Sequence, residues 1–139
     1  MGVESIPMNT RRDFLAVAST ALSQARIIGA NDRIRFGIIG AGERGACHAR
    51  RLAKRAEAEV VSICDVYRVR ADGARDRSNP QADVVQDYRR VLDRKDIDAV
   101  VISVSDHWHS QILMDSVTAG KDVYLGANED TGMTMFKLF

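Results

Sequence analysis

The sequence lacks a long apolar run, an excess of charge of one sign and a framework of cysteines. Its 139 residues carry a formal net charge of +1, with acidic and basic residues mixed along the chain. This mixture gives no electrostatic footprint for nucleic acid or for a membrane surface. The two cysteines, Cys47 and Cys64, are neither a metal-type pair nor a disulfide framework. The length and composition are those of one ordinary globular domain.

The most informative stretch holds two apolar runs, at residues 34–39 and 60–64, with a glycine turn after the first. The turn reads Gly40-Ala41-Gly42-Glu43-Arg44-Gly45. We expect Gly40 to turn the chain sharply, Gly42 to let the backbone approach a pyrophosphate, and Gly45 to let a helix pack close to the sheet. The N–H groups and positive dipole end of that helix would point at the phosphates. The alternative is that the glycines only shape a turn.

An acidic residue, Asp65, ends the second apolar run twenty residues after Gly45. A carboxylate at this place can accept hydrogen bonds from both hydroxyls of an adenosine ribose, and it would repel a 2′-phosphate. The sequence therefore favours NAD over NADP as the cofactor. Arg68 stands three residues further on and could soften that preference.

The rest of the chain predicts helices alternating with strands. We expect helices at about residues 67–77, 87–92 and 109–119, with Asp87 capping the second and Gly120 ending the third. We expect strands at 84–85, 99–104 and 122–125. This order predicts an α/β fold, namely a Rossmann-like doubly wound parallel sheet. The first helix carries a cluster of basic residues, which we interpret as a solvated face: Arg50, Arg51, Lys54 and Arg55.

Residues 1–29 do not belong to this pattern. Residues 10–15, Thr-Arg-Arg-Asp-Phe-Leu, resemble the twin-arginine export signal, and the mild apolar segment at 16–22 is too short to span a bilayer. Small residues at Ser23 and Ala25 could flank a cleavage point. The resemblance implies the twin-arginine export machinery as a partner and a periplasmic or secreted location. The alternative is an ordinary amphipathic or disordered N-terminus.

Four stretches together resemble the N-terminal part of the Gfo/Idh/MocA oxidoreductase family. They are the signal followed by residues 29–34, the glycine loop continuing to His48, the strand ending in Cys64-Asp65, and residues 105–109 followed by 119–124. Members are NAD(P)-dependent enzymes that transfer hydride and mostly act on sugars, inositols and related polyols. The resemblance implies a dinucleotide-binding Rossmann domain at 30–125. In the family, a second α/β domain follows, whose open sheet often builds the interface of a homo-oligomer.

The resemblance also implies which residues bind the cofactor. They are Gly40, Ala41, Gly42, Glu43, Arg44, Gly45, Asp65, Ser103, Asp106, His107 and His109. The histidines after residue 103 could also be read as metal ligands or acid–base groups. We favour the interpretation that Asp106 caps the next helix, that Trp108 packs under it, and that the histidines border the cofactor without holding a metal. We interpret His48 as packing near the loop.

The chain departs from the family after residue 125. The family usually continues with Glu-Lys-Pro, whose lysine reaches the nicotinamide and the substrate hydroxyl, whereas this chain has Gly126-Ala127-Asn128. Lys137 is too far along to take that role, so the catalytic residue is unknown.

We therefore expect a truncated or frameshifted product that lacks the C-terminal α/β domain and is inactive alone. Its residues 126–139 would be a divergent tail without a role in the fold. Two alternatives to a polyol oxidoreductase stay open. One is an NAD-dependent glycoside hydrolase relative, and the other is a non-catalytic, degenerate nucleotide-binding fragment.

Overall fold

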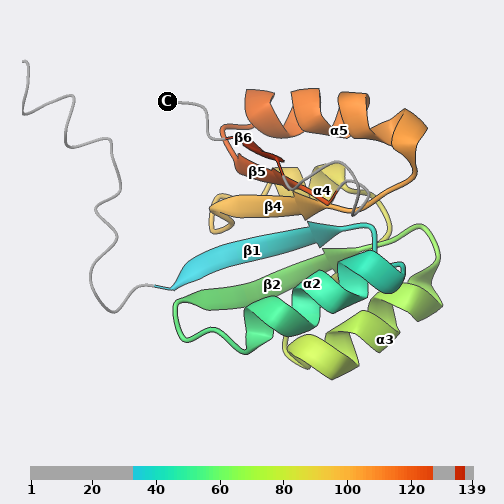
Figure 1. Ribbon diagram of the computed structural model, residues 1–139, viewed down its shortest axis with the longest axis vertical. Coiled ribbons are helices and arrows are strands. Elements are labelled where there is room, and N and C mark those ends of the chain that lie inside the picture. Colours follow the sequence, from blue (N-terminus) through green and yellow to red (C-terminus); the bar gives the residue numbers. More distant parts are fainter. Residues whose placement is uncertain (1–32, 127–133, 137–139) are drawn as a thin grey trace, which may run out of the picture. The chain divides into compact units, whose positions relative to one another are not determined.

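A computed structural model of the chain describes residues 33–126 and 134–136, which form one six-stranded sheet. The strand order is β3-β2-β1-β4-β5-β6. Figure 1 shows the part of this order from β2 to β6. The first five strands pair in parallel, and β6 pairs antiparallel to β5. The strands are β1 (Ile34–Ile39), β2 (Ala58–Cys64), β3 (Asp83–Val85), β4 (Ala99–Ile102), β5 (Asp122–Leu125) and β6 (Thr134–Phe136).

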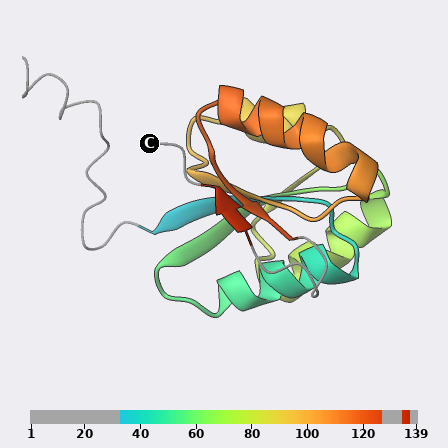
Figure 2. The same cartoon turned by 45° about the horizontal axis from the view of Figure 1, so that its top comes forward.

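Four helices cover the two faces of this sheet. They are α2 (Glu43–Ala53), α3 (Arg68–Ser78), α4 (Arg89–Leu92) and α5 (Asp106–Thr118). Helices α2 and α3 lie on one face, and α4 and α5 lie on the other, as Figure 2 shows. The predicted Rossmann-like doubly wound α/β fold is therefore confirmed.

The strands are apolar along their length because they are covered on both faces. All four residues of β4 are buried, and β4 lies between β1 and β5, as a continuous apolar run predicts. Under α2 and α3 the sheet contributes Ile38, Val60 and Val101 to the core. These two helices contact each other and the sheet through small side chains, Ala46, Ala49, Ala71 and Ala74, all of which are buried.

Several element boundaries differ from the sequence prediction: β2 begins at Ala58 rather than at 60, and α4 begins at Arg89 rather than at 87. Strand β4 ends at Ile102 rather than at 104, and α5 begins at Asp106 rather than at 109. Ser105 is the N-cap of α5, with extended backbone angles of φ −63° and ψ 148°. The first turn of α5 is polar, so apolar periodicity did not reveal it.

The expectation that residues 126–139 lack a role in the fold is wrong for residues 134–136. This segment pairs with β5 in the register Val123↔Phe136 and Leu125↔Thr134. A strand at the edge of a sheet offers unpaired N–H and C=O groups, and three extended residues are enough to pair with them. Residues 1–29 lie outside the described residues. So do residues 127–133 and 137–139 of the tail, which include Ala127, Asn128 and Lys137.

No helix within the described ranges is long and apolar enough to cross a membrane.

Candidate functional site

The glycine turn lies at the carboxyl ends of β1, β2 and β4 and is fixed to two neighbouring strands. Gly40 has a φ of +92°, and a Cβ at this position would collide with the carbonyl oxygen of Ser103. Its N–H donates a 2.8 Å hydrogen bond to the carbonyl of Cys64, and the N–H of Ser103 donates to that of Ile39 at 2.8 Å. Only glycine meets both the positive φ and the close approach. The sharp turn predicted for Gly40 is therefore present.

Gly45 allows helix α2 to start directly against the turn. A Cβ at Gly45 would collide with the carbonyl oxygen of Gly40, and it would lie 3.5 Å from the Cβ of Ser103. The sequence predicted close packing of this helix on the sheet. The structure shows that the tightest contact is with the loop itself, and that Ser103 at the end of β4 is the next neighbour.

Gly42 differs from the other two glycines because it faces open space. It is the N-cap of α2, with a φ of −63°, and apart from its chain neighbours no atom of the described residues lies within 4 Å of where its Cβ would be. It makes no side-chain cap. The first N–H groups of α2, which form the positive end of the helix dipole, are therefore not covered by a capping side chain. An anionic phosphate fits this position chemically and sterically.

Asp65 follows β2 and faces the turn. Its Oδ2 accepts a 2.8 Å hydrogen bond from the N–H of Ala41, and its Oδ1 accepts one of 2.8 Å from the N–H of Tyr67. Each carboxylate oxygen has a second lone pair, so both can still accept a hydrogen bond from a ribose hydroxyl. The open space at Gly42 and the carboxylate of Asp65 are thus held close together through Ala41, and these residues fit the adenosine half of a dinucleotide.

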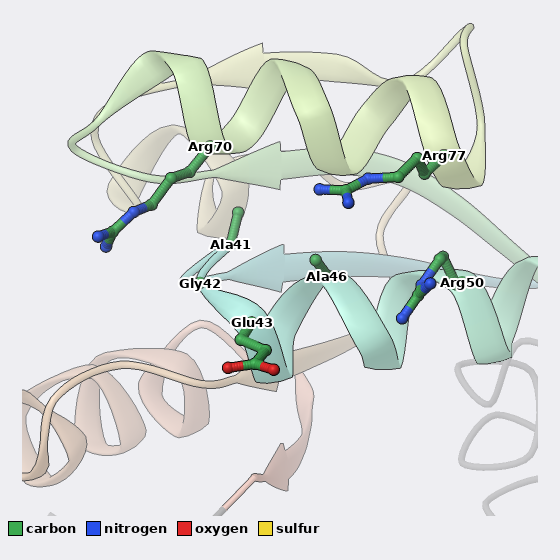
Figure 3. Close-up of a pocket in the computed structure, with 7 residues that line it drawn as sticks. All are labelled: Ala41, Gly42, Glu43, Ala46, Arg50, Arg70 and Arg77. Carbon is green, nitrogen blue, oxygen red and sulfur yellow. The ribbon is translucent and has the colours of Figure 1, made fainter.

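A pocket of about 450 Å³ opens beside the turn, between α2 and α3 (Figure 3). It is lined by Ala41, Gly42, Glu43, Ala46, Arg50, Arg70 and Arg77. Arg50, which we interpreted as part of a solvated helix face, is exposed and also lines this pocket. Arg68 does not line the pocket, and its Nε instead lies 3.6 Å from a carboxylate oxygen of Asp72.

Sequence reasoning missed Arg70 and Arg77 as site residues. They come from α3, seven residues apart and thus on one face of the helix. This spacing is a signal that was present in the sequence. It could not be used alone, because the sequence does not show which face of α3 meets α2.

The second group of expected cofactor residues follows β4. Ser103 lies beneath the turn, and its buried hydroxyl has no hydrogen-bond partner among the described residues. The Nδ1 of His109 is 3.9 Å from a carboxylate oxygen of Asp106, and the buried Nε2 of His109 has no hydrogen-bond partner in the described part of the chain. His107 contacts Trp108, with ring centroids 5.9 Å apart. These residues lie at the carboxyl end of a strand next to β1, where a doubly wound sheet binds its ligand.

The expected packing of two residues in this group is wrong. Trp108 does not pack under the helix, because 49% of it is exposed. Asp106 is the first residue of α5 and not its cap, since Ser105 is the N-cap and no side chain makes a capping hydrogen bond. The Asp106 carboxylate still lies in the first turn, where a negative charge interacts favourably with the helix dipole.

His48, which we expected to pack near the loop, contacts Tyr124 of β5. Its ring makes an edge contact with Tyr124, at a centroid distance of 5.5 Å. Burial lowers the pKa of His48 below its ordinary value, and the positive charges of Arg51 and Arg44 lower it further. In the part of the chain that the structure describes, no group of three or more His, Cys, Asp or Glu residues could hold a metal ion.

Residues 34–125 match the family described as "Oxidoreductase family, NAD-binding Rossmann fold". The chain is 34% identical over 92 residues to inositol 2-dehydrogenase from Salmonella typhimurium, a match that covers 66% of this chain and 27% of that protein. It is 33% identical over 100 residues to alpha-N-acetylgalactosaminidase from Shewanella oneidensis, and this match covers 66% of this chain and 22% of that protein. The chain thus spans about a quarter of the length of these curated relatives.

Solved structures resemble the fold as well. The myo-inositol dehydrogenase from Lactobacillus casei, in complex with NAD(H) and myo-inositol, has a TM-score of 0.64 at 28% identity, over 67% of this chain and 28% of that one. A 3-ketoreductase from Actinomadura kijaniata, in complex with NADP, has a TM-score of 0.62 at 27% identity. The match covers 68% of this chain and 30% of that one. With the family match spanning most of the chain, this protein belongs to the Gfo/Idh/MocA oxidoreductase family, and residues 34–125 are its NAD-binding Rossmann fold.

Proposed function

We propose that this chain is the cofactor-binding part of an oxidoreductase that transfers hydride between NAD and a sugar, an inositol or a related polyol. The observation that carries the proposal is the pairing of Asp65 with the backbone of Ala41, which puts a ribose acceptor beside the open N-terminus of α2. Support for the substrate class comes from relatives named as inositol dehydrogenases.

Each part of the site has one task in this proposal. The N–H groups at Gly42 and Glu43 hold the diphosphate, and the Asp65 carboxylate holds the adenosine ribose. The residues that follow β4, Ser103 to His109, border the nicotinamide side, because the sheet changes winding direction between β1 and β4. NAD, when bound, supplies the hydride acceptor, and the protein orients it and excludes water.

Nucleotide binding is tested by calorimetric titration of the full chain with NAD. We expect micromolar affinity, and a loss of at least about tenfold in Asp65→Ala, because charged hydrogen bonds to the ribose disappear. Asp76→Ala is the matched control, since Asp76 is an exposed carboxylate on α3 that pairs with Arg75. A folded chain that does not bind NAD, or equal loss in both variants, would contradict the proposal.

The substrate class is tested by a chimera. Residues 34–125 replace the corresponding segment of the Salmonella inositol 2-dehydrogenase, which supplies the rest of that enzyme. We expect NADH formation from myo-inositol, and its loss on Asp65→Ala in the same chimera. A chimera that binds NAD but oxidises no polyol or sugar would reject the proposed reaction while leaving the cofactor site intact.

A glycoside hydrolase is the second candidate, because the relatives at 33% identity include an alpha-N-acetylgalactosaminidase. A hydrolase that oxidises its substrate only transiently releases free sugar without accumulating NADH. The corresponding chimera with the Shewanella protein is therefore assayed for both products. Sugar release that depends on bound NAD, without net NADH, would favour this candidate over the first.

Export by the twin-arginine route to the periplasm is a further part of the proposal. It is supported by the residue pattern at 10–22, which lies outside the described residues. Fusion of residues 1–32 to a reporter, followed by cell fractionation, tests it. We expect a periplasmic reporter, and a cytoplasmic one when Arg11→Lys and Arg12→Lys are combined. Periplasmic location of both versions would reject this route.

A further inference from the structure

Trp108 is the only tryptophan of the chain, and its ring is half-exposed at the start of α5. It belongs to the first turn of this helix, where its backbone N–H donates a 3.0 Å hydrogen bond to the carbonyl of the N-cap residue, Ser105. Because α5 follows β4, this turn lies at the carboxyl ends of the parallel strands. A large apolar ring is thus presented to solvent at the end of the sheet where ligands bind.

The side of α5 that carries Trp108 faces β1. The helix packs on the sheet through Ile112 and Ser116, which are both buried. Trp108 and Asp115 are seven residues apart and therefore share a different stripe of the helix. The carboxylate of Asp115 accepts a 2.6 Å hydrogen bond from the hydroxyl of Tyr88, which directly precedes α4. Helix α4 contacts β2, on the far side of β1 from β4, so this stripe is turned toward β1.

The ends of β1 and β4 mark the place where the sheet changes its winding direction. The two strands are neighbours, but the chain leaves β1 for α2 on one face and leaves β4 for α5 on the other. Figure 2 shows these helices on opposite faces. A doubly wound sheet binds its ligand at such a switch point. The glycine turn borders this point on the β1 side, and the first turn of α5, with Trp108 directed toward β1, borders it on the β4 side.

The surroundings of Trp108 suit a cation. Helix α5 contains two carboxylates, Asp106 and Asp115, and no lysine or arginine. Asp106 lies in the first turn, where its charge offsets the positive end of the helix dipole. Among the described residues, arginines lie over the rings of Tyr67 and Tyr88, and none lies over the indole. The face of an indole attracts a cation more strongly than other aromatic side chains do, and here no side-chain cation occupies it.

The two redox states of a nicotinamide differ in charge. The oxidised ring is a pyridinium cation, and it becomes a neutral dihydropyridine when it accepts a hydride. An indole at the nicotinamide end of the site therefore interacts with the two states unequally, because only the oxidised ring gains the attraction between a cation and an aromatic face.

We propose that Trp108 contacts the nicotinamide ring and binds its oxidised form in preference to its reduced form. This role rests on the proposed function and deepens it, because it assigns the cofactor's preferred redox state to one side chain. The reduced cofactor loses the contact as it forms, so it dissociates more readily than it would from a site without the indole. The side chain that the sequence placed under the helix thus serves the cofactor instead.

The test is calorimetric titration of the full chain with NAD, with NADH and with ADP-ribose, which lacks the nicotinamide. Trp108→Leu should weaken NAD by about three- to tenfold, and NADH and ADP-ribose by less than about twofold. Trp108→Phe should recover part of the lost NAD affinity, because a phenyl face attracts a cation more weakly than an indole does. Met114→Ala is the matched control, since Met114 is an exposed apolar residue of α5 outside its first turn. It should change none of the three affinities.

The emission of the single tryptophan reports the same contact directly. NAD should quench it, and ADP-ribose should leave it nearly unchanged. Equal quenching by both would overturn the proposal, because another part of the nucleotide would then lie at Trp108.

The binding data separate this proposal from the proposed function. Equal weakening of NAD and NADH in Trp108→Leu would overturn the redox preference, since apolar packing would then explain the contact. Binding of ADP-ribose and NAD with no effect of Trp108→Leu would overturn the role of Trp108 and leave the cofactor site standing. A folded chain that binds none of the three nucleotides would overturn both.

Discussion

The N–H of Ala41 donates a 2.8 Å hydrogen bond to Oδ2 of Asp65, although the two residues are 24 positions apart in the sequence. This bond joins the turn after β1 to the acid after β2. The groups expected to hold phosphate and ribose are therefore fixed relative to each other before any nucleotide binds.

Replacing Asp65 should destabilise the chain even without a nucleotide. Asp65→Ala leaves the N–H groups of Ala41 and Tyr67 without their acceptor, so we expect the free energy of unfolding to fall by about 1–3 kcal/mol. Urea unfolding followed by circular dichroism measures it. Asp76→Ala, at an exposed site, should change stability by less than about 0.5 kcal/mol. Identical unfolding curves for the two variants would show that the bond does not support the turn.

The glycines of the turn should separate stability from binding. Gly40→Ala combines a φ of +92° with a collision against the Ser103 carbonyl, so we expect a loss of more than about 2 kcal/mol. Gly42→Ala has an ordinary φ and open space, so the fold should be kept while a methyl group hinders the approach of the diphosphate. Thermal melts and NAD titration of both variants test this. NAD affinity unchanged in Gly42→Ala would place the diphosphate elsewhere.

An ion-pair cluster at the amino ends of the strands, opposite to the glycine turn, should contribute to acid stability. The side chain of Arg94 donates to both carboxylate oxygens of Asp96, at 3.0 and 2.7 Å. This hydrogen bonding, with the charges of Arg94 and Arg35, lowers the pKa of Asp96 from 3.8 to about 2. The contribution is present above pH 3.8 and is lost as the pH falls toward 2. Asp96→Asn should flatten the stability profile in that window, measured by thermal melting from pH 5 to 2. An unchanged slope would show that other carboxylates cause acid unfolding.

The two thiols should react at very different rates. Cys64 is buried in β2, and burial, with the charges of Asp65 and Asp87, raises its pKa to about 12. Its reactive thiolate form is therefore negligible at neutral pH, whereas Cys47 is partly exposed. Labelling with a maleimide should modify one thiol quickly and the second only on unfolding. Cys47→Ser should abolish the fast phase, and fast labelling that persists in this variant would contradict the buried position of Cys64.

The strands of the parallel sheet were predictable because burial on both faces leaves a continuous apolar run, as at Ala99–Ile102. The residues expected on the adenosine side were also predictable. A glycine turn after one strand and an acid at the end of the next strand together indicate a dinucleotide site, and the positive φ of Gly40 shows that the turn requires glycine. Element boundaries at polar segments were not, as the early start of α5 at Asp106 shows.

The sequence alone could not predict which elements contact one another. Nothing in residues 134–136 marks them as the antiparallel partner of β5, since pairing depends on a free edge and not on a local pattern. Arg70 lines the pocket between α2 and α3, whereas Arg68 pairs with Asp72. This difference depends on how α3 is rotated against α2, and the weak apolar pattern of α3 does not predict that rotation. The exposure of Trp108 likewise follows from how α5 sits on the sheet.

The alanines through which α2 and α3 contact each other and the sheet also affect the entropy of ligand binding. Ala46, Ala49, Ala71 and Ala74 have no side-chain rotamers, so the helix contact behind the pocket has almost no side-chain freedom to lose when a ligand arrives. The helices also cannot adapt to a ligand by changing rotamers along their contact. The backbone frame of the pocket is therefore of fixed shape, and the entropic penalty of binding falls on the ligand and on the exposed arginines that line the pocket, Arg50, Arg70 and Arg77.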